Sequence, residues 1–376
     1  MTSWDREAVA RIRRSPANTS PIIEPSTLRA ALPGRYVWDY WPLRTPAGSV
    51  ADLEGRIGWV ALSVPDDTEP EERHFVASLR FATSQPGETS WMDGGELFPE
   101  GTAKGARQWA GSTVYHPESG RVDVYYTACG VEGETDSSYE QRLVQTSGRL
   151  GFERGRPILG EWDRHRTILE GDGRIYATTI GERAAPGKID AFRDPAFLRD
   201  PATGADHLLF TATVADSGSD HDGAVGVARF DGARWTLMPP LLTAVGVNKE
   251  LERPHVVSRD GRYYLFFTTH HWTFAPGIGG PEGLYGFVAD ELAGPYRPLN
   301  GSGLVFGNPP SEPHQAYSWL VLDDGTVLGF ADYPGLEGRD LESEFDRDPT
   351  FKKRLFAGTP APVQRITLDG DQAALA

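Results

Sequence analysis

Three carboxylates stand out by their placement in the chain. Asp39 occurs in residues 37–43 (VWDYWPL), Asp194 in residues 192–195 (FRDP) and Glu252 in residues 247–255 (VNKELERPH). Each carboxylate lies shortly before a strand-like segment. Carboxylates can act as general acids, general bases or nucleophiles when they meet in one site. The secondary-structure elements that carry the three carboxylates must therefore place them close together.

Five β-rich segments repeat along the chain. Runs of Val, Tyr, Phe and Thr bounded by Gly or Asp predict strands, and a period of several tens of residues is typical of propeller blades. Four short strands per blade fit the spacing, which runs from 56 to 85 residues. We therefore predict an all-β fold, a five-bladed β-propeller. The segments begin at Gly55, Gly120, Ala205, Gly261 and Gly325.

The residues ahead of these segments predict a common funnel. Equivalent positions of successive blades surround the axis of a propeller, so their side chains should line one opening. Acidic and aromatic side chains in one opening are typical of a sugar site. The residues concerned precede their segments by 16, 11, 11, 9 and 8 residues, and they are Asp39, Trp109, Asp194, Glu252 and Tyr317.

The chain divides into an arm and a propeller in this prediction. Residues 1–34 form an N-terminal arm with a short helix at about residues 4–14, anchored on the propeller by Trp4, and residues 35–376 form a single propeller domain. The highly charged residues 336–353 are expected to form a surface loop or solvated helix without a catalytic role. Cys129 is the only cysteine, so an intramolecular disulfide and a cysteine-based zinc site are excluded, and we expect its thiol to be buried.

The amino-acid composition limits the classes of molecule that the protein is expected to bind. The net charge of −16 argues against nucleic acid and against an anionic membrane surface, and it favours a neutral small molecule such as a sugar. No secretory signal and no apolar stretch of 18 residues is readable. The sequence therefore predicts a cytoplasmic protein, or one secreted by a leaderless route or as a trimmed mature form.

The three runs, in this order, resemble the motifs of glycoside hydrolase family 68, the bacterial levansucrases, inulosucrases and β-fructofuranosidases. The resemblance implies a five-bladed propeller that acts on sucrose with retention, through a covalent fructosyl-enzyme intermediate, and passes fructose to water or to a sugar. It implies that Asp39 is the nucleophile, Asp194 the transition-state stabiliser and Glu252 the acid/base. A retaining mechanism needs the Asp39 and Glu252 carboxyls roughly 5–5.5 Å apart. Glu252 is expected to be protonated near neutral pH, with Glu250 contributing negative charge.

The resemblance also implies contacts to the substrate. Two tryptophans would form an apolar wall against the sugar, a histidine would lie near the acceptor, and a tyrosine would lie near the acid/base. Residues beside the carboxylates are expected to bind the substrate as well. In this order the residues are Trp38, Trp109, His270, Tyr317, Arg193, Glu250 and Arg253. No cofactor is expected.

Two departures from the family pattern bear on the chemistry. Ala110 stands where relatives have a serine that would hydrogen-bond the nucleophile, so either Ser112 compensates or Asp39 is held differently. Lys249 stands where calcium-binding relatives have an aspartate, and a cation there opposes calcium. We therefore predict no structural calcium and no other metal site.

Other interpretations remain open at this level. Asp39 could be a turn residue, Asp194 a strand-end acid and Glu252 a surface partner of Arg253. A related propeller acting on fructans or arabinose-containing glycans would keep the three carboxylates and reject sucrose. A sugar-binding propeller without catalysis would keep the aromatic residues but has no need of the carboxylates.

Overall fold

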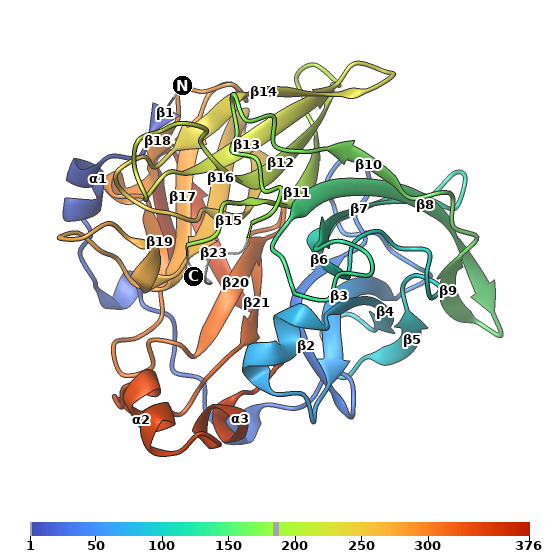
Figure 1. Ribbon diagram of the computed structural model, residues 1–376, viewed down its shortest axis with the longest axis horizontal. Coiled ribbons are helices and arrows are strands. Elements are labelled where there is room, and N and C mark those ends of the chain that lie inside the picture. The colour runs from blue at the N-terminus through green and yellow to red at the C-terminus, as the bar shows by residue number, and fades with distance from the viewer. Residues whose placement is uncertain (1, 183–187) are drawn as a thin grey trace.

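Five antiparallel sheets follow one another along the chain. The computed structural model describes residues 2–182 and 188–376, so Met1 of the arm and residues 183–187 of the propeller lie outside the described part. Each sheet contains four or five strands, and the five are arranged around a common centre (Figure 1). The predicted five-bladed β-propeller is confirmed.

The strands divide among the blades as follows. Blade I has β2 (Arg35–Pro42), β3 (Ile57–Pro65), β4 (Ser78–Ser84) and β5 (Met92–Glu96). Blade II has β6 (Arg107–His116), β7 (Arg121–Cys129), β8 (Gln141–Glu153), β9 (Arg156–Gly160) and β10 (Arg166–Leu169). Blade III has β11 (Phe192–Arg199), β12 (Asp206–Thr213), β13 (Gly223–Phe230) and β14 (Trp235–Thr243), and β1 (Thr2–Ser3) is added at its edge.

The last two blades follow the same plan. Blade IV has β15 (Glu252–Arg259), β16 (Arg262–Thr269), β17 (Gly283–Ala289), β18 (Arg297–Pro298) and β19 (Leu304–Gly307). Blade V has β20 (Ala316–Val321), β21 (Thr326–Ala331), β22 (Thr359–Pro360), β23 (Gln364–Asp369) and β24 (Gln372–Leu375). The five β-rich segments of the sequence form the second strands: β3, β7, β12, β16 and β21.

The first strands of the blades form a closed inner ring. Each of β2, β6, β11, β15 and β20 contacts the first strands of both neighbouring blades. Their side chains therefore face a common centre. The residues that the sequence placed ahead of each repeat lie on these five strands.

In each blade, the pairing between the inner strand and the second strand is interrupted at the same level. The pairing with the second strand shifts at Trp38/Trp41, Trp109/Gly111, Arg193/Ala196, Glu252/His255 and Tyr317/Leu320. In four blades a non-glycine residue at the shift adopts a positive φ, which costs about 1–3 kcal/mol per residue. These four residues and their φ values are Asp39 (40°), Asp194 (60°), Arg253 (48°) and Ser318 (62°). In blade II the bulge contains Gly111, where a Cβ would come within 1.9 Å of the Tyr125 carbonyl oxygen.

The N-terminal arm is tied to blades III and IV. β1 pairs in parallel with β14, and Trp4 is fully buried against the rings of Phe267 and Phe287. The helix α1 (Arg6–Ala10) is shorter than expected, because Asp5 caps its start by accepting from Ala8 N. Figure 1 shows α1 beside β17 and β18. The 3-10 helices of the chain are η1 (Pro16–Asn18), η2 (Pro25–Thr27), η3 (Pro70–Phe75), η4 (His271–Thr273) and η5 (Leu299–Gly301).

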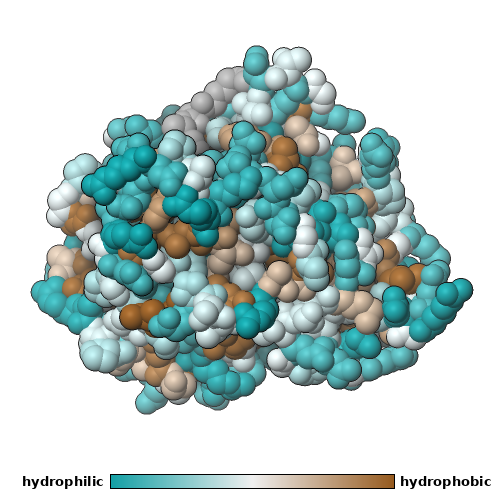
Figure 2. Space-filling model, turned by 90° about the horizontal axis from the view of Figure 1, so that it is seen from below, coloured by the Kyte–Doolittle hydropathy of each residue, from teal (hydrophilic) through white to brown (hydrophobic). Residues whose placement is uncertain are grey.

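The charged segment at residues 336–353 contains α2 (Leu341–Arg347), and α3 (Phe351–Leu355) begins at its end. Both helices lie at the lower edge of the view in Figure 1. Seen from that side, hydrophobic residues are scattered among hydrophilic ones (Figure 2). The Cys129 thiol is buried, as expected. Among the described helices, none has both the length and the apolar character needed to cross a membrane.

Candidate active site

A cavity of about 580 Å³, here called the front cavity, opens at the beginnings of the inner strands. Residues from all five blades line it, because the bulges of the five inner strands lie at the same level. Every site residue expected from the sequence lines it. They are Trp38, Asp39, Trp109, Arg193, Asp194, Glu250, Glu252, Arg253, His270 and Tyr317.

Asp194 is held on the floor of the front cavity by two threonines. Its backbone N–H donates to Thr127 Oγ1 over 2.8 Å, and its Oδ2 accepts from Thr211 Oγ1 over 2.9 Å. Burial raises the pKa of Asp194 to about 7, and the charges of Glu252 and Asp39 act in the same direction. The three carboxylates are therefore close enough for each to sense the others' charge.

Asp39 is partly buried at the positive-φ position of β2. Burial raises its pKa, while the Arg253 guanidinium and a hydrogen bond from the Ser318 side chain oppose that rise. Ser318 occupies the equivalent position in blade V, one residue after Tyr317. It supplies the hydroxyl that Ala110 cannot. Ser112 does not compensate, because it does not line the front cavity and its Oγ lies against blade III, where it accepts from Phe197 N over 2.9 Å.

Arg253 ties three blades together beneath Asp39. Its Nη1 donates to the carbonyl oxygen of Ser318 at 3.0 Å and to Ser318 Oγ at 2.8 Å, and its Nη2 donates to the Tyr40 carbonyl oxygen at 3.0 Å. The side chain is buried, so it is not a surface partner of Glu252. Arg253 thus provides a fixed positive charge for Asp39.

Glu252 accepts hydrogen bonds on both oxygens. Arg193 Nη2 lies 2.8 Å from Oε1, and the Tyr317 hydroxyl donates to Oε2. Arg193 Nη2 also lies 3.4 Å from Glu250 Oε1. Burial opposes ionisation of Glu252, but Arg193, His270 and Tyr317 outweigh it and lower its pKa, whereas burial raises the pKa of Glu250.

The expectation of a protonated Glu252 is therefore wrong for this arrangement. Its pKa is lowered because the Arg193 guanidinium, one residue before Asp194, reaches across to the next blade. The two carboxyls share one cation, so Arg193 lowers the pKa of Glu252 while burial raises that of Glu250. The expectation took into account only negative charge near Glu252 and its poor solvation, and it did not include a cation from the neighbouring blade.

Aromatic rings wall one side of the front cavity. Trp38 and Trp109 both meet the His74 ring edge-on, at centroid distances of 6.0 and 6.4 Å. Trp109 Nε1 donates to the His74 carbonyl oxygen over 2.9 Å, which fixes the indole. Burial lowers the pKa of His74 well below its usual value, so the ring is neutral. The expected apolar wall thus includes a histidine that the sequence did not indicate.

His270 lies in a stack of three rings. Its ring centroid is 3.7 Å from that of Tyr317 and 4.0 Å from that of Trp272, with interplanar angles of 12° and 14°. Its Nε2 lies 3.8 Å from Glu252 Oε2, and its Nδ1 lies 2.9 Å from Glu282 Oε1. Burial lowers the pKa of His270, but Glu282 and Glu252 outweigh this and raise it. His270 is therefore protonated more readily than a free imidazole, and it lies beside Glu252.

Several residues of the front cavity were missed from the sequence. Asp332 follows β21, and burial raises its pKa to about 6. Arg73 stands 5.9 Å over the Trp38 ring and 4.0 Å from Asp332. The segment 336–353 also contributes to the rim, through Asp340, Leu341, Glu342 and Lys352. It was expected only at the surface, because its charge pattern carries no information about which opening it borders.

Lys249 occupies a position between two carboxylates. Its Nζ lies 2.7 Å from Asp190 Oδ1 and 2.9 Å from Asp222 Oδ1, and the side chain is buried. The ammonium therefore occupies the space between these two carboxylates and offsets part of their negative charge. This arrangement supports the prediction that calcium does not bind beside Glu250.

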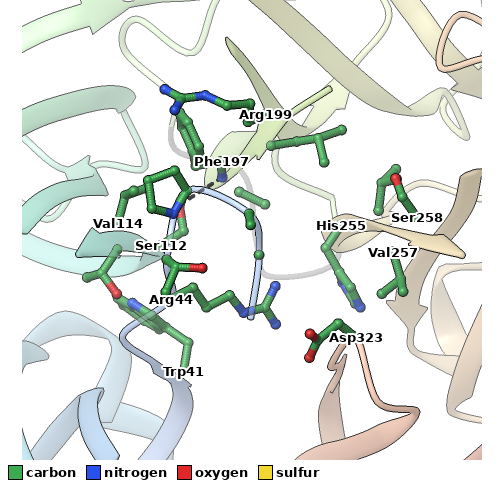
Figure 3. A pocket seen from close by; sticks show the side chains of 18 of the residues that line it. Trp41, Arg44, Ser112, Val114, Phe197, Arg199, His255, Val257, Ser258 and Asp323 are labelled. Atoms are coloured by element: carbon green, nitrogen blue, oxygen red, sulfur yellow. Dashed lines mark hydrogen bonds between the residues drawn. The ribbon is translucent and has the colours of Figure 1, made fainter. Parts of the chain in front are cut away.

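A second cavity of about 520 Å³, the rear cavity, lies where the same inner strands continue past the bulges. Figure 3 shows the Arg44 side chain extending across it towards Asp323 and His255. Ser112 also lines it. His255 Nε2 accepts from Val321 N over 2.9 Å, and Nδ1 lies 2.9 Å from the Arg253 carbonyl oxygen. His255 thus orders the strand that carries Glu252 from the side opposite to the front cavity.

Comparisons with known proteins agree with this architecture. The sequence profile of the family described as levansucrase/invertase matches residues 1–228 and 218–375, well beyond the Tyr317 region where the recognised motifs end. A levansucrase, LscA of Pseudomonas savastanoi pv. glycinea, is 34% identical over 99% of this chain and 93% of its own length. The extracellular sucrase of Zymomonas mobilis subsp. mobilis is 32% identical over 90% of this chain and 84% of its own length.

Solved structures share the fold. An inulosucrase from Halalkalicoccus jeotgali bound to kestose superposes with a TM-score of 0.92 at 42% identity, covering 100% of this chain and 95% of that one. A β-fructofuranosidase from Microbacterium saccharophilum K-1 superposes with a TM-score of 0.85 at 24% identity, covering 100% of this chain and 83% of that one. The second likeness concerns the fold alone.

Proposed function

The chain belongs to glycoside hydrolase family 68, the levansucrase and invertase family, and we propose on that premise that its front cavity cleaves sucrose with retention and transfers the fructosyl unit. The observation that carries the proposal is the meeting of three carboxylates in one cavity, each with different partners. Asp39 faces Arg253 and Ser318, Asp194 faces two threonines, and Glu252 faces Arg193 and Tyr317.

Asp39 is the nucleophile in this proposal. Its carboxylate attacks the anomeric carbon of the fructosyl unit, and the bond to the glucose oxygen breaks. Arg253 and the Ser318 hydroxyl favour the ionised form that attack requires. The positive φ at Asp39 turns the side chain out of the strand and into the front cavity.

Glu252 protonates the departing glucose oxygen and later takes a proton from the acceptor. It shares Arg193 with Glu250, so a movement of the guanidinium towards Glu250 would weaken its contact with Glu252 and raise the pKa of Glu252. We propose that the sugar triggers this movement when it replaces water beside Glu252. The Tyr317 hydroxyl then keeps Glu252 in position.

Asp194 stabilises the oxocarbenium-like transition state by accepting hydrogen bonds from fructosyl hydroxyls. The Nη1 atom of Arg193 is buried and has no hydrogen-bond partner among the described residues, so it can donate to a substrate oxygen. Trp38 and Trp109 provide the apolar wall of the sugar site. The remaining rim, formed by His270, Trp272 and the segment around α2, borders the space for the acceptor.

The proposal is tested by incubating the protein with sucrose and measuring free glucose and free fructose separately. Equal release means hydrolysis, and an excess of glucose means transfer to a sugar. Release of neither sugar would contradict the proposal. Where the protein acts remains a prediction, and measuring sucrose cleavage in cells and in culture supernatant tests whether it acts inside or outside the cell.

The two catalytic roles need a sharper experiment. Glu252→Ala should release the aryl group of an aryl β-fructofuranoside in a rapid first turnover, since this leaving group needs no proton, whereas Asp39→Ala should not be rescued in this way. Equal rescue of both variants, or of neither, would overturn the division of roles. Glu118→Ala, in an exposed turn between β6 and β7, is a control of matched chemistry.

A further inference from the structure

Three histidines surround one buried carboxylate at the edge of the front cavity. Glu282, directly before β17, has Oε1 at 2.9 Å from His270 Nδ1, 3.1 Å from His314 Nδ1 and 3.5 Å from His271 Nδ1. Its side chain is only 1% exposed. Oε2 is buried and lacks a hydrogen-bond partner anywhere in the described ranges. The carboxylate therefore has one crowded oxygen and one unused oxygen.

The crowding is unusual for a simple hydrogen-bond cluster. A carboxylate oxygen has two lone pairs, so three imidazole N–H groups cannot all donate to it with good geometry. An unsatisfied buried carboxylate oxygen also costs stability. The crowding at Oε1 is relieved if a cation takes the place of protons on two of the rings, and Oε2 is left free to complete its coordination.

The spacing suits a metal ion. The ligand atoms of His271, His314 and Glu282 all lie within 4.8 Å of one another. Tetrahedral zinc, with bonds of about 2.0–2.1 Å, places its ligand atoms roughly 3.4 Å apart. The two nitrogen-to-oxygen separations, 3.1 and 3.5 Å, lie on either side of this value.

We propose that His271, His314 and Glu282 form a binding site for a divalent transition-metal ion of the zinc type. Imidazole nitrogens with one carboxylate are a donor set that Zn²⁺ and Cu²⁺ prefer, whereas Ca²⁺ and Mg²⁺ prefer oxygen ligands. An ion can reach the site from the front cavity, because His271 and His314 line that cavity and the His271 side chain is half exposed. A fourth position stays open for water or a sugar hydroxyl.

Occupation of this site has a consequence for catalysis that rests on the proposed function. His270 donates to the same Glu282 oxygen and stands 3.8 Å from Glu252. A metal ion on Glu282 withdraws that carboxylate from His270 and places positive charge close to the acid/base. We expect sucrose cleavage to fall when the ion is bound. The binding itself does not depend on the role of Glu252.

The test is titration calorimetry of the full chain with Zn²⁺ after chelator treatment, together with the visible absorption of bound Co²⁺. Removing a metal's supporting residue typically weakens binding about 10–100-fold, so removing a ligand should cost at least tenfold. His271→Ala and His314→Ala should each lose this much affinity. His207→Ala is the matched control, since His207 lies on β12 and contacts the Ala205 carbonyl oxygen. Because His271 is half exposed, its variant should fold normally.

One tight ion per chain that disappears in both ligand variants and persists in His207→Ala supports the site, as does a low-symmetry Co²⁺ spectrum in the wild type and His207→Ala that both ligand variants lack. Equal Zn²⁺ affinity in all four proteins would overturn it and leave the histidines as hydrogen-bond donors. Zn²⁺ should also inhibit sucrose cleavage by the wild type and not by His271→Ala. Tight binding with unchanged cleavage would overturn only the link to His270, and a protein that binds zinc but never cleaves sucrose would overturn the proposed function and not the site.

Discussion

Arg193 on β11 donates from Nη2 to Oε1 of Glu252 on β15 over 2.8 Å. The same guanidinium nitrogen lies 3.4 Å from Glu250 Oε1, so two carboxyls depend on one cation. Arg193 belongs to the blade that carries Asp194. The ionisation of the acid/base is therefore set from the neighbouring blade, and changes in blade III should alter proton transfer in blade IV.

Asp39→Ala and Glu252→Ala should each abolish sucrose turnover and leave the fold intact. Each variant removes a group used in bond formation or proton transfer, and loss of a positioned acid or base typically costs about 10²–10⁴-fold. Glucose release gives kcat, and circular dichroism checks the fold. A variant that keeps more than about a tenth of wild-type kcat, a loss below ~1.4 kcal/mol, would show that its assignment is wrong.

Ser318→Ala should shift the acidic limb of the kcat/KM profile to higher pH. The hydroxyl's hydrogen bond favours ionised Asp39, so its removal raises the pKa of Asp39 further. Activity that requires the ionised nucleophile then appears at higher pH. Ser112→Ala is the control, because Ser112 lies in the rear cavity. A shift caused by Ser112→Ala and not by Ser318→Ala would reverse the assignment.

Asp194→Asn should stabilise the protein increasingly as pH rises from about 4 to 7. The pKa of Asp194 is raised to about 7 in the folded state, against about 3.9 for an unperturbed aspartate. Across this range the folded wild type binds more protons than the unfolded chain, so its stability falls as pH rises. Asparagine does not titrate. Melting temperatures at several pH values test this, and a constant difference between the two proteins would contradict it.

Calcium should not raise the melting temperature of the chelator-treated protein, because the Lys249 ammonium already lies between Asp190 and Asp222. Lys249→Ala should lower the free energy of unfolding by roughly 3 kcal/mol, the lower end for breaking a buried pair, since the Asp190 side chain is 33% exposed. Lys188→Ala serves as the control for loss of a lysine. A clear drop in melting temperature with chelator, restored by calcium, would reveal a calcium site.

His270→Ala should lower the ratio of transfer to hydrolysis more than it lowers total sucrose consumption. A sugar acceptor needs more positioning than water does, and His270 forms the middle of the ring stack at the acceptor side. Removal of the His270 imidazole should also raise the pKa of Glu252. An unchanged product ratio at high sucrose, with both rates intact, would assign His270 a structural role alone.

Much of the architecture could be predicted, because the second strands carry uninterrupted Val, Tyr, Phe and Thr and repeat at blade spacing. The positions of Asp39, Asp194 and Glu252 followed from their similar placement, 9 to 16 residues before those segments. Ser318 could have been found by the same argument, since it occupies the register of Asp39 and Asp194. The hydroxyl was instead sought at Ser112, close to the missing serine in the chain.

Other features depend on distances that the sequence does not contain. The lowered pKa of Glu252 comes from Arg193, which is 59 residues away. The cluster of His271, Glu282 and His314 joins η4, the start of blade IV's third strand and the loop before β20, so no local spacing marks it. The helix α1 begins at the Asp5 cap and ends at Arg11, whose backbone N–H turns back to the Ala8 and Val9 carbonyl oxygens, and the sequence pattern does not mark this end.

The first and last blades meet without sharing a strand. Blade I is built from residues 35–96 and blade V from residues 316–375. This seam is held by the hydrogen bond from Val37 N to the Gly358 carbonyl oxygen at 2.7 Å and by the edge-on contact of Tyr36 with Phe356. Asp39 and its partner Ser318 stand on opposite sides of it. Sucrose cleavage therefore measures whether the propeller ring is closed. Opening the ring between blades I and V would leave five folded sheets but would separate Asp39 from Ser318.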